Sequence, residues 1–220
     1  MVRNLSADEI CDQVLHWWPD GVDSVAFMGM GEALANPHTF EALRTLTDRD
    51  AFGLAPRRIT VSTVGFLPGL RRLVANYPKV TFTLSVHSPY DEERVELIPL
   101  QQRFPLLDNL EVLDAHVGET RRKAYLAYLL IAGVNDTEQH ATDLATLVRS
   151  RKNPELFHLS VIPYNEAAGV RPDYQRAAPE QVERFLAVLR SHRLHATRRQ
   201  QFGEDQEAAC GQLHASYLNR

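Results

Sequence analysis

Two kinds of hydrophobic spacing alternate along the chain. Short runs in which nearly every residue is apolar are separated by longer stretches in which apolar residues recur every three or four positions. Continuous apolar runs are typical of strands in a buried parallel sheet, and the longer spacing is typical of amphipathic helices. The pattern predicts an α/β fold of repeated strand–helix units, as a doubly wound sheet or a partial (βα) barrel. The predicted strands are Val25–Met28, Ile59–Ser62, Val80–Val86, Lys123–Ile131, Leu156–Ile162 and a weaker Leu194–Arg198.

Capping residues place the helices between these strands. Ser6 followed by Glu9 has the spacing of a capping box and predicts a helix at the start of the chain. Asn36-Pro37 is predicted to supply the N-cap and first residue of a second helix, and Pro68 to open a third. Asp136 is predicted to cap a later helix. The last helix carries apolar residues at helical spacing, namely Val182, Phe185, Leu186 and Leu189.

The length of 220 residues supports one domain. We expect a single domain over residues 1–220, with 203–220 as a C-terminal extension. The first predicted element is a helix, whereas a βα barrel normally opens with a strand. The expected architecture is therefore a partial barrel that misses its first strand. The segment 89–119 is not assigned to an element, and 166–178 is predicted to be a loop.

The chain contains only two cysteines, Cys11 and Cys210. That number excludes a disulfide framework, a four-cysteine zinc module and a self-sufficient iron–sulfur cluster, and it fits a reducing, cytoplasmic location. No apolar run reaches the ~18 residues of a membrane span. The net charge of −4 argues against bulk electrostatic attraction to nucleic acid, but not against a local basic patch. Basic clusters occur at Arg57-Arg58, Arg71-Arg72, Arg121-Arg122-Lys123, Arg151-Lys152 and Arg198-Arg199, each explicable as a solvated face and together able to track a phosphate backbone.

Polar groups follow four of the predicted strands. They are the segments Gly29-Met30-Gly31-Glu32, Ser62-Thr63, Ser85-Val86-His87-Ser88 and Pro163-Tyr164-Asn165. Each alone could be ordinary turn chemistry. Because the carboxyl ends of parallel strands meet at one edge of the sheet, the four together predict a shared ligand site there. The Gly29-x-Gly31 pair does not continue as a dinucleotide fingerprint, since Leu34 stands where the third glycine belongs, and Glu32 beside it suits a ligand ammonium group.

The cysteines and histidines offer weaker candidates. Cys11 lies on the first amphipathic helix and is interpreted as packing. Cys210, in a polar setting beside Gly211, is either inert packing or a reactive thiol. The nine histidines do not fall into metal-ligand spacing, so no metal site is predicted from the residues.

The ordered motifs of the chain resemble the RlmN/Cfr family of radical-SAM RNA methyltransferases. The resemblance covers essentially the whole chain, and details such as the residues of 31–36 and 87–90 are closer to the Cfr branch. The motifs are Phe27–Asn36, Val61–Gly65, Leu84–Tyr90, Gly133–Asp136, Ile162–Asn165 and Ala208–Leu213.

This resemblance implies a radical-SAM-type barrel, a cofactor and a substrate. S-adenosylmethionine would be bound by Gly31, Glu32, Ser62, Ser85, Val86, His87 and Asn165. Cys210 matches the methyl-carrying catalytic cysteine, and the substrate would be an adenine of 23S rRNA, modified at C8 or C2. The family also uses a [4Fe–4S] cluster held by a C-x3-C-x2-C motif before the segment that matches Val2–Leu5. That motif is absent from this sequence.

Because the cluster-binding thiolates are missing, more than one functional hypothesis remains open. The first is that the chain is part of a Cfr-like rRNA adenine methyltransferase and is inactive by itself. The alternative is a cluster-free relative that binds S-adenosylmethionine or RNA without catalysis. A third, weaker hypothesis is an α/β barrel enzyme with other chemistry, for which no convincingly placed lysine or carboxylate pair is seen. The sequence does not predict an oligomeric state.

Overall fold

A computed structural model describes residues 3–29, 31–165 and 173–200. Its strands are β1 (Val25–Phe27), β2 (Ile59–Thr63), β3 (Thr81–Ser85), β4 (Ala124–Ala132), β5 (Phe157–Pro163), β6 (Gln175–Arg176) and β7 (His195–Arg198). Its α-helices are α1 (Ala7–Trp17), α2 (Thr39–Thr47), α3 (Leu67–Asn76), α4 (Asp91–Leu97), α5 (Leu106–Thr120), α6 (Glu138–Arg149) and α7 (Pro179–Ser191). Short 3-10 helices are η1 (Trp18–Asp20), η2 (Ala33–Ala35), η3 (Pro56–Arg58), η4 (Pro99–Gln102) and η5 (Pro154–Leu156). The six predicted strands are all present, and no end differs from its predicted position by more than one residue.

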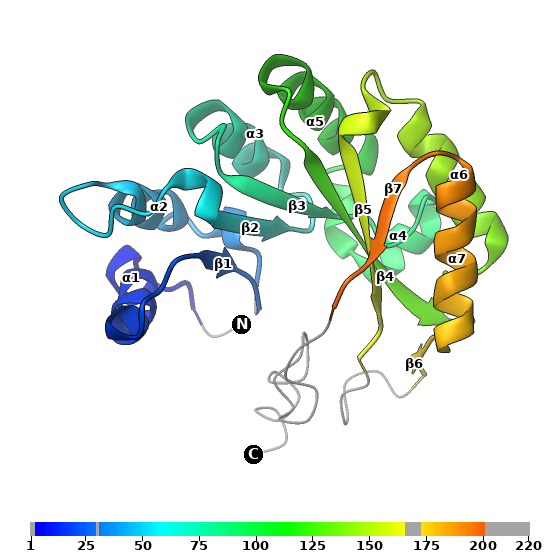
Figure 1. Cartoon of the computed structure of the whole chain (residues 1–220), viewed down its shortest axis with the longest axis horizontal. Helices are drawn as coiled ribbons and strands as arrows, with labels where there is room; N and C mark the ends of the chain where they lie inside the picture. The colour runs from blue at the N-terminus through cyan, green and yellow to red at the C-terminus, as the bar shows by residue number, and fades with distance from the viewer. Residues whose placement is uncertain (1–2, 30, 166–172, 201–220) are drawn as a thin grey trace.

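The order of the strands decides between the two predicted architectures. The main sheet runs β1-β2-β3-β4-β5-β7, and each of these strands pairs in parallel with its neighbour. Connections between parallel strands almost always have the same hand. When each new strand is added on the same side of the previous one, as here, all the connecting helices therefore lie on one face of the sheet. In a doubly wound sheet the direction in which strands are added reverses once, which places helices on both faces. The chain is therefore built as a partial (βα) barrel, with its helices on the outer side of a curved sheet (Figure 1).

Alternation along the strands separates a hydrophobic face from a polar one. Val61, Leu84, Leu126 and Val161 are at most 1% exposed and join the helices in one core. The residues between them point to the opposite face because strand side chains alternate. That inner face carries Thr60, Ser62, Thr83, Ser85, Tyr125, His158, Ser160 and Thr197. A polar inner face, without a helix packed on it among the described residues, leaves room for a ligand.

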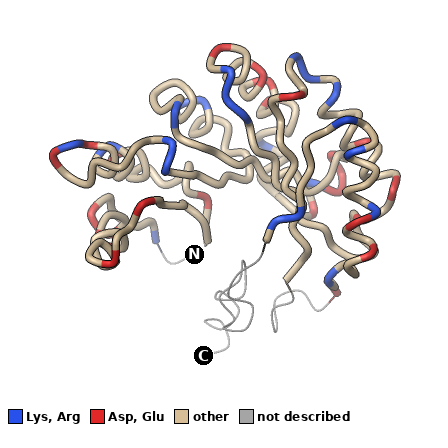
Figure 2. Tube along the Cα trace, viewed as in Figure 1, with Lys and Arg blue, Asp and Glu red and all other residues tan. Residues whose placement is uncertain are grey.

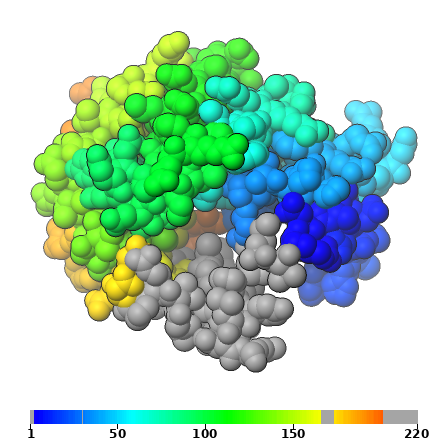
Figure 3. Space-filling view, turned by 180° about the vertical axis from the view of Figure 1, so that it is seen from behind, coloured from blue at the N-terminus to red at the C-terminus, as the bar shows by residue number. Residues whose placement is uncertain are grey.

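The unassigned segment 89–119 forms α4, η4 and most of α5. Seen from behind, these residues occupy the green centre of the surface, between α1–α2 in blue and the later helices (Figure 3). The α4–η4 insertion follows the carboxyl end of β3, so it lies at the edge where the ligand site is predicted.

Within the predicted loop 166–178, residues 175–176 instead form β6, antiparallel to the end of β4.

Two predicted helix starts are wrong, one by a single residue and the other by two. Thr137, not Asp136, is the N-cap of α6: the Thr137 side chain accepts a hydrogen bond from the amide of His140 at 3.2 Å. Asp136 instead accepts from the amide of Gly133. The second helix begins at Thr39, because Asn36 accepts from the amide of His38 in an Asx turn that precedes it. The capping box of Ser6 and Glu9 and the start of α3 near Pro68 are confirmed.

Candidate active site

The site residues predicted from sequence lie at the carboxyl ends of four strands. Gly31 and Glu32 follow β1, Ser62 lies in β2, Ser85 ends β3 and is followed by Val86 and His87, and Asn165 comes two residues after β5. These strands are parallel members of one sheet, so their carboxyl ends point to the same edge. Cys210 lies outside the described residues, as does the extension at 203–220.

Ser62 and Ser85 share the polar inner face. Ser62 in β2 pairs in register with Thr83 in β3, and Ser85 lies two residues after Thr83 in β3. Side chains two residues apart in a strand point to the same side, so all three share one face of the sheet. Ser85 is 8% exposed and Ser62 is half-buried. Two hydroxyl groups therefore stand on adjacent strands near the edge, where each can donate to and accept from a polar ligand.

Glu32 joins the ends of β1 and β2. Its two carboxylate oxygens accept hydrogen bonds from the amides of Leu34, at 3.1 Å, and Val64, at 2.8 Å. Burial raises the pKa of this carboxyl, while the bonds from Val64, Thr63 and Leu34 act against that rise. A carboxylate oxygen has more than one lone pair, so both oxygens can still accept from a ligand cation.

Arg94, which sequence reasoning missed, forms hydrogen bonds with backbone groups at the same edge. This side chain is fully buried in α4 and donates to the carbonyls of Val64, Ser85 and Val86 at 2.9–3.1 Å. It also donates to Gln101, which in turn donates to Asp91. Burial lowers the pKa of the Arg94 guanidinium to about 10. One buried cation thus links the ends of β2 and β3. No local sequence pattern predicts this role, because arginine is rarely buried and Arg94 would be expected at the surface.

His87 adopts a conformation that few residues other than glycine adopt. Its φ of 63° turns the chain after β3, and its Nδ1 accepts a hydrogen bond from the amide of Leu129 at 3.0 Å. Burial, followed by the charge of Arg94, lowers the pKa of His87 to about 4. The imidazole is therefore neutral at pH 7, and because Nδ1 accepts, Nε2 carries the proton and can donate.

Asn135 joins the turn at His87 to β4. This fully buried side chain donates to the carbonyls of His87 and Leu129 and accepts from the amide of Ile131, at 2.6–2.8 Å. The amide group satisfies three backbone groups that the ladder between β3 and β4 leaves without a strand partner. The sequence motif at 133–136 marks this residue, but its role follows only from the fold.

A second polar network lies on the helix side of the same edge. The buried Ser88 hydroxyl donates to Glu93 at 2.6 Å, and a Glu93 oxygen lies 3.1 Å from His140 Nε2. The Tyr90 hydroxyl donates to Asp143 at 2.6 Å, which lowers the pKa of Asp143 and raises that of Tyr90 to about 12. These bonds attach the loop after β3 to α6 and so fix its position.

The two ends of the sheet approach each other at this edge. The backbone amide of Arg199, just past β7, donates to Val161 in β5, and its guanidinium donates to the Met28 sulfur at 3.2 Å. Met28 directly follows β1, at the other end of the strand order. This contact between the first and last parallel strands indicates that the sheet curls around its polar inner face.

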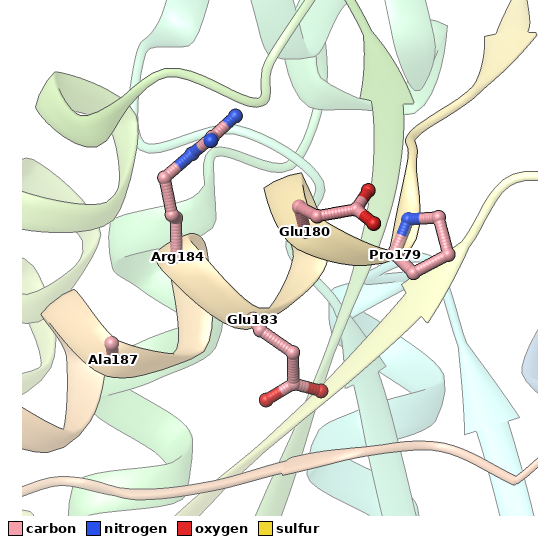
Figure 4. A pocket seen from close by; sticks show the side chains of 5 residues that line it. All are labelled: Pro179, Glu180, Glu183, Arg184 and Ala187. Atoms are coloured by element: carbon pink, nitrogen blue, oxygen red, sulfur yellow. The ribbon is translucent and has the colours of Figure 1, made fainter.

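A shallow depression on α7 is separate from this site. It is lined by Pro179, Glu180, Glu183, Arg184 and Ala187, and Figure 4 shows all five on successive turns of one helix. A surface formed by a single helix provides no converging groups around a ligand.

The described residues contain neither a metal-binding cluster nor a membrane-spanning helix. Cys11 is buried in the core, and the described part of the chain contains no group of three or more His, Cys, Asp or Glu side chains able to hold a metal ion. Among the described helices, none combines the length and the apolar character needed to cross a bilayer.

The chain is similar in sequence to curated rRNA methyltransferases. It is 46% identical over 217 residues to the ribosomal RNA large subunit methyltransferase Cfr of Shouchella clausii, which is 98% of this chain and 62% of that protein. It is also 46% identical to Cfr of Staphylococcus aureus and 42% identical to Cfr of Clostridium botulinum strain Hall. The chain therefore spans less than two thirds of the length of these relatives. No protein-family model matches it.

Solved structures agree with the sequence match. The crystal structure of a radical SAM methyltransferase from Sphaerobacter thermophilus aligns with a TM-score of 0.88 and 35% identity, over 96% of this chain and 62% of that one. A domain of the pyruvate-formate lyase-activating enzyme of Bacteroides vulgatus aligns with a TM-score of 0.60 at 19% identity, which bears on the fold alone. Along nearly all of its own length, the chain is thus a homologue of the Cfr/RlmN family of radical SAM methyltransferases.

Proposed function

We propose that this chain is the S-adenosylmethionine-binding unit of a radical-SAM methyltransferase that acts on large-subunit rRNA. The observation that carries the proposal is the convergence of Glu32, Ser62, Ser85 and His87 at one edge of the sheet, beside the inner face that no described helix covers. The similarity to Cfr proteins supplies the chemical class. Because the chain spans only 62% of those relatives, the complete reaction is part of the proposal.

The side chains at this edge suit S-adenosylmethionine, which carries an amino acid group, a ribose and an adenine. The half-buried Glu32 carboxylate can accept from the ammonium group, and the Ser62 and Ser85 hydroxyls can bind carboxylate or ribose oxygens. Gly29 and Gly31 have φ of 111° and 84°, and open space surrounds Gly29 where a side chain would stand, so the backbone can approach a ligand closely there. Val86 and Asn165 complete the proposed cofactor site.

The proposed methyl acceptor within the protein is Cys210. The proposal rests on the match of residues 208–213 to the family motif. The transfer continues to an adenine of 23S rRNA at C8 or C2, which are the two positions that the family resemblance implies. When bound, S-adenosylmethionine would supply the methyl group, and the residues of this chain would bind it, orient it and exclude water.

The residues of this chain do not fit an iron–sulfur cluster. A [4Fe–4S] cluster needs three or four thiolates close together, and the sequence has only Cys11 and Cys210. Cys11 is 8% exposed and packs from α1 into the hydrophobic core. We therefore derive no step through a cluster held by these residues. The cysteine count favours a second proposal, that the chain binds the cofactor or RNA without catalysis.

Calorimetric titration of the full chain with S-adenosylmethionine tests the binding proposal. We expect measurable affinity, and a loss of about tenfold or more in the Ser62→Ala/Ser85→Ala variant, because each hydroxyl contributes roughly 1 kcal/mol. Thr60→Ala is the matched control, since Thr60 lies on the same strand and face but two residues toward the amino end. Absence of binding in the folded wild-type chain, or equal loss in the control, contradicts the proposal.

A further inference from the structure

Basic residues gather at the edge of the sheet opposite the proposed cofactor site. Each strand from β2 to β5, and β7, is preceded by lysine or arginine. We call these residues the basic rim: Arg57, Arg58, Lys79, Arg121, Arg122, Lys123, Lys152 and Arg193.

Strand register brings the basic rim together. Thr60 pairs with Thr81 and Thr83 with Tyr125, so the residues just before β2, β3 and β4 are neighbours across the sheet. Direct contacts tie the loops to one another. Arg122 donates to the carbonyl of Lys79 at 3.0 Å, and Arg121 donates to Asn153, before β5, at 2.8 Å.

The rim differs from the rest of the molecule in charge. The whole chain has a net charge of −4, whereas the segments before these five strands, at 48–58, 77–80, 121–123, 150–156 and 192–194, contain ten lysines and arginines and only three acids, Asp48, Asp50 and Glu155. Asp23 pairs with Arg58 and Glu155 with Arg121, both at about 3.4–3.5 Å. Figure 2 shows blue segments at η3 and in the turns that precede β4 and β5.

Two of the rim arginines occupy backbone positions that favour glycine. Arg121 ends α5 with φ 56°, and Arg193 follows α7 with φ 60°. Helices commonly end in this left-handed conformation, and glycine is the usual residue because other residues are strained there. The chain therefore keeps a positive side chain at two places where backbone stability alone favours glycine.

Helix polarity accounts for part of this pattern. The carboxyl ends of α3, α5, α6 and α7 lie at this edge, and cations near helix carboxyl ends are stabilising. That effect acts within the last turn of a helix. Lys123 and Lys152 lie three residues beyond the ends of α5 and α6, whereas Arg57 and Arg58 belong to η3, a single turn whose dipole is small; all four side chains are exposed.

The exposed groups of the rim suit RNA better than a lipid bilayer. Adjacent strands lie about 4.8 Å apart, so the rim from β2 to β7 spans roughly 20 Å, enough to meet several backbone phosphates. Arginine and lysine side chains bind phosphate oxygens in either ligand, but a surface that binds a bilayer usually adds exposed apolar side chains. The large exposed apolar residues of the described chain are Leu5, Leu15, Trp17, Met28 and Leu107, and none belongs to the rim.

We propose that the basic rim binds the phosphate backbone of RNA, as an anchoring surface separate from the cofactor edge. The inference rests on the proposed function, because it assigns a second contact to the same RNA partner. The rim lies roughly 17 Å from the cofactor edge, the length of a five-residue strand. It therefore contributes to RNA affinity and leaves cofactor binding unchanged.

Fluorescence anisotropy with a short labelled RNA hairpin, titrated at several KCl concentrations, tests the rim in the full chain. Neutralising two rim lysines in Lys123→Gln/Lys152→Gln should weaken RNA binding several-fold. It should also reduce the slope of log affinity against log salt by about 1.5, since each phosphate contact contributes about 0.7–0.9. Arg71→Gln/Arg184→Gln removes the same charge from exposed positions on α3 and α7 and should change neither quantity.

A second variant separates RNA binding from helix stabilisation. Within the described residues the Arg193 side chain makes no ion pair or hydrogen bond, and Arg193→Gly supplies the residue that its backbone prefers. We expect Arg193→Gly to unfold at a urea concentration no lower than wild type, yet to bind the hairpin more weakly. Unchanged RNA affinity and salt slope in both rim variants overturn the proposal.

The remaining outcomes distinguish the partner and the cofactor. Cosedimentation of the chain with phosphatidylserine vesicles, without hairpin binding, overturns the RNA assignment in favour of a lipid surface. Calorimetry with S-adenosylmethionine on the same variants should match wild type. If the wild-type chain binds no cofactor but the rim variants still lose RNA affinity, the rim is supported and the proposed function fails.

Discussion

At the scale of single residues, the proposed site depends on polar side chains that satisfy backbone groups. Arg94 holds the carbonyls at the ends of β2 and β3, Glu32 holds the amides of Leu34 and Val64, and Asn135 holds the turn at His87. Each buried donor or acceptor left without a partner costs about 1–3 kcal/mol. These residues therefore couple the shape of the site to the stability of the fold.

The depressed pKa of His87 predicts a loss of stability in acid. The unfolded chain binds a proton near pH 6.5 and the folded chain only near pH 4, so protons favour unfolding between these values. Protonating Nδ1 also breaks its bond from the Leu129 amide. We expect the free energy of unfolding, measured with urea, to fall by roughly 2 kcal/mol from about pH 7 to about pH 5 through this group.

The control for this prediction is His87→Asn. Asparagine tolerates a positive φ, and its Oδ1 can accept from the Leu129 amide without titrating in this range. The variant should lose about 2 kcal/mol less than wild type over the same interval. Parallel pH profiles for the two proteins contradict the argument.

At the scale of elements, β4 is the longest strand and pairs with three neighbouring strands. It pairs with β3 up to Ala127, with β5 as far as Leu130, and with β6 at Ile131 and Ala132. Beyond Ala127 the partner on the β3 side changes from strand backbone to the side chains of His87 and Asn135. The end of β3 can thus turn away toward α4 while β4 continues.

Asn135→Ala should therefore destabilise the chain by about 3 kcal/mol or more, because three buried backbone groups lose their partner. Urea unfolding followed by circular dichroism measures the change. Asn153→Ala is the matched control: Asn153 Oδ1 accepts only from the exposed Arg121 side chain, and its loss should cost under about 1 kcal/mol. A small effect at Asn135 would show that the ladder rearranges without it.

At the scale of the whole molecule, the fold brings polar groups to the edge proposed to bind the cofactor, while the sequence supplies only two cysteines. The features needed to bind the cofactor can therefore be considered separately from those needed for radical chemistry. The unreversed strand order keeps the helices on the outside and the inner face open, which is what binding requires. Radical chemistry needs in addition a cluster with three or four thiolate ligands.

The 220-residue chain should consequently transfer no methyl group to 23S rRNA fragments after reconstitution with iron and sulfide. The checks are the visible absorption of a cluster and incorporation of label from methyl-labelled S-adenosylmethionine, with the Staphylococcus aureus Cfr as a positive control. Calorimetric binding of the same cofactor should persist. Methylation of the fragments by the isolated chain contradicts this prediction.

Much of the fold follows from the sequence because apolar spacing reports local geometry directly. All six parallel strands were predictable from continuous apolar runs, and the capping box at Ser6 follows from two residues three apart. The starts of α2 at Thr39 and of α6 at Glu138 were not predictable, since several neighbouring polar residues can each cap a helix, and packing selects one. The two-residue strand β6 is too short for any spacing pattern to mark.

The sequence by itself determined the class of fold, the strand ends that bear polar groups, and the shortage of thiolates. Those properties depend on residue identity and on short-range spacing. Only the tertiary structure decided that the strand order does not reverse, that Arg94 joins the ends of β2 and β3, and that scattered basic pairs come together along one edge. These depend on which strands become neighbours. Neighbours are set by packing between segments that lie far apart in the chain, which no local pattern records.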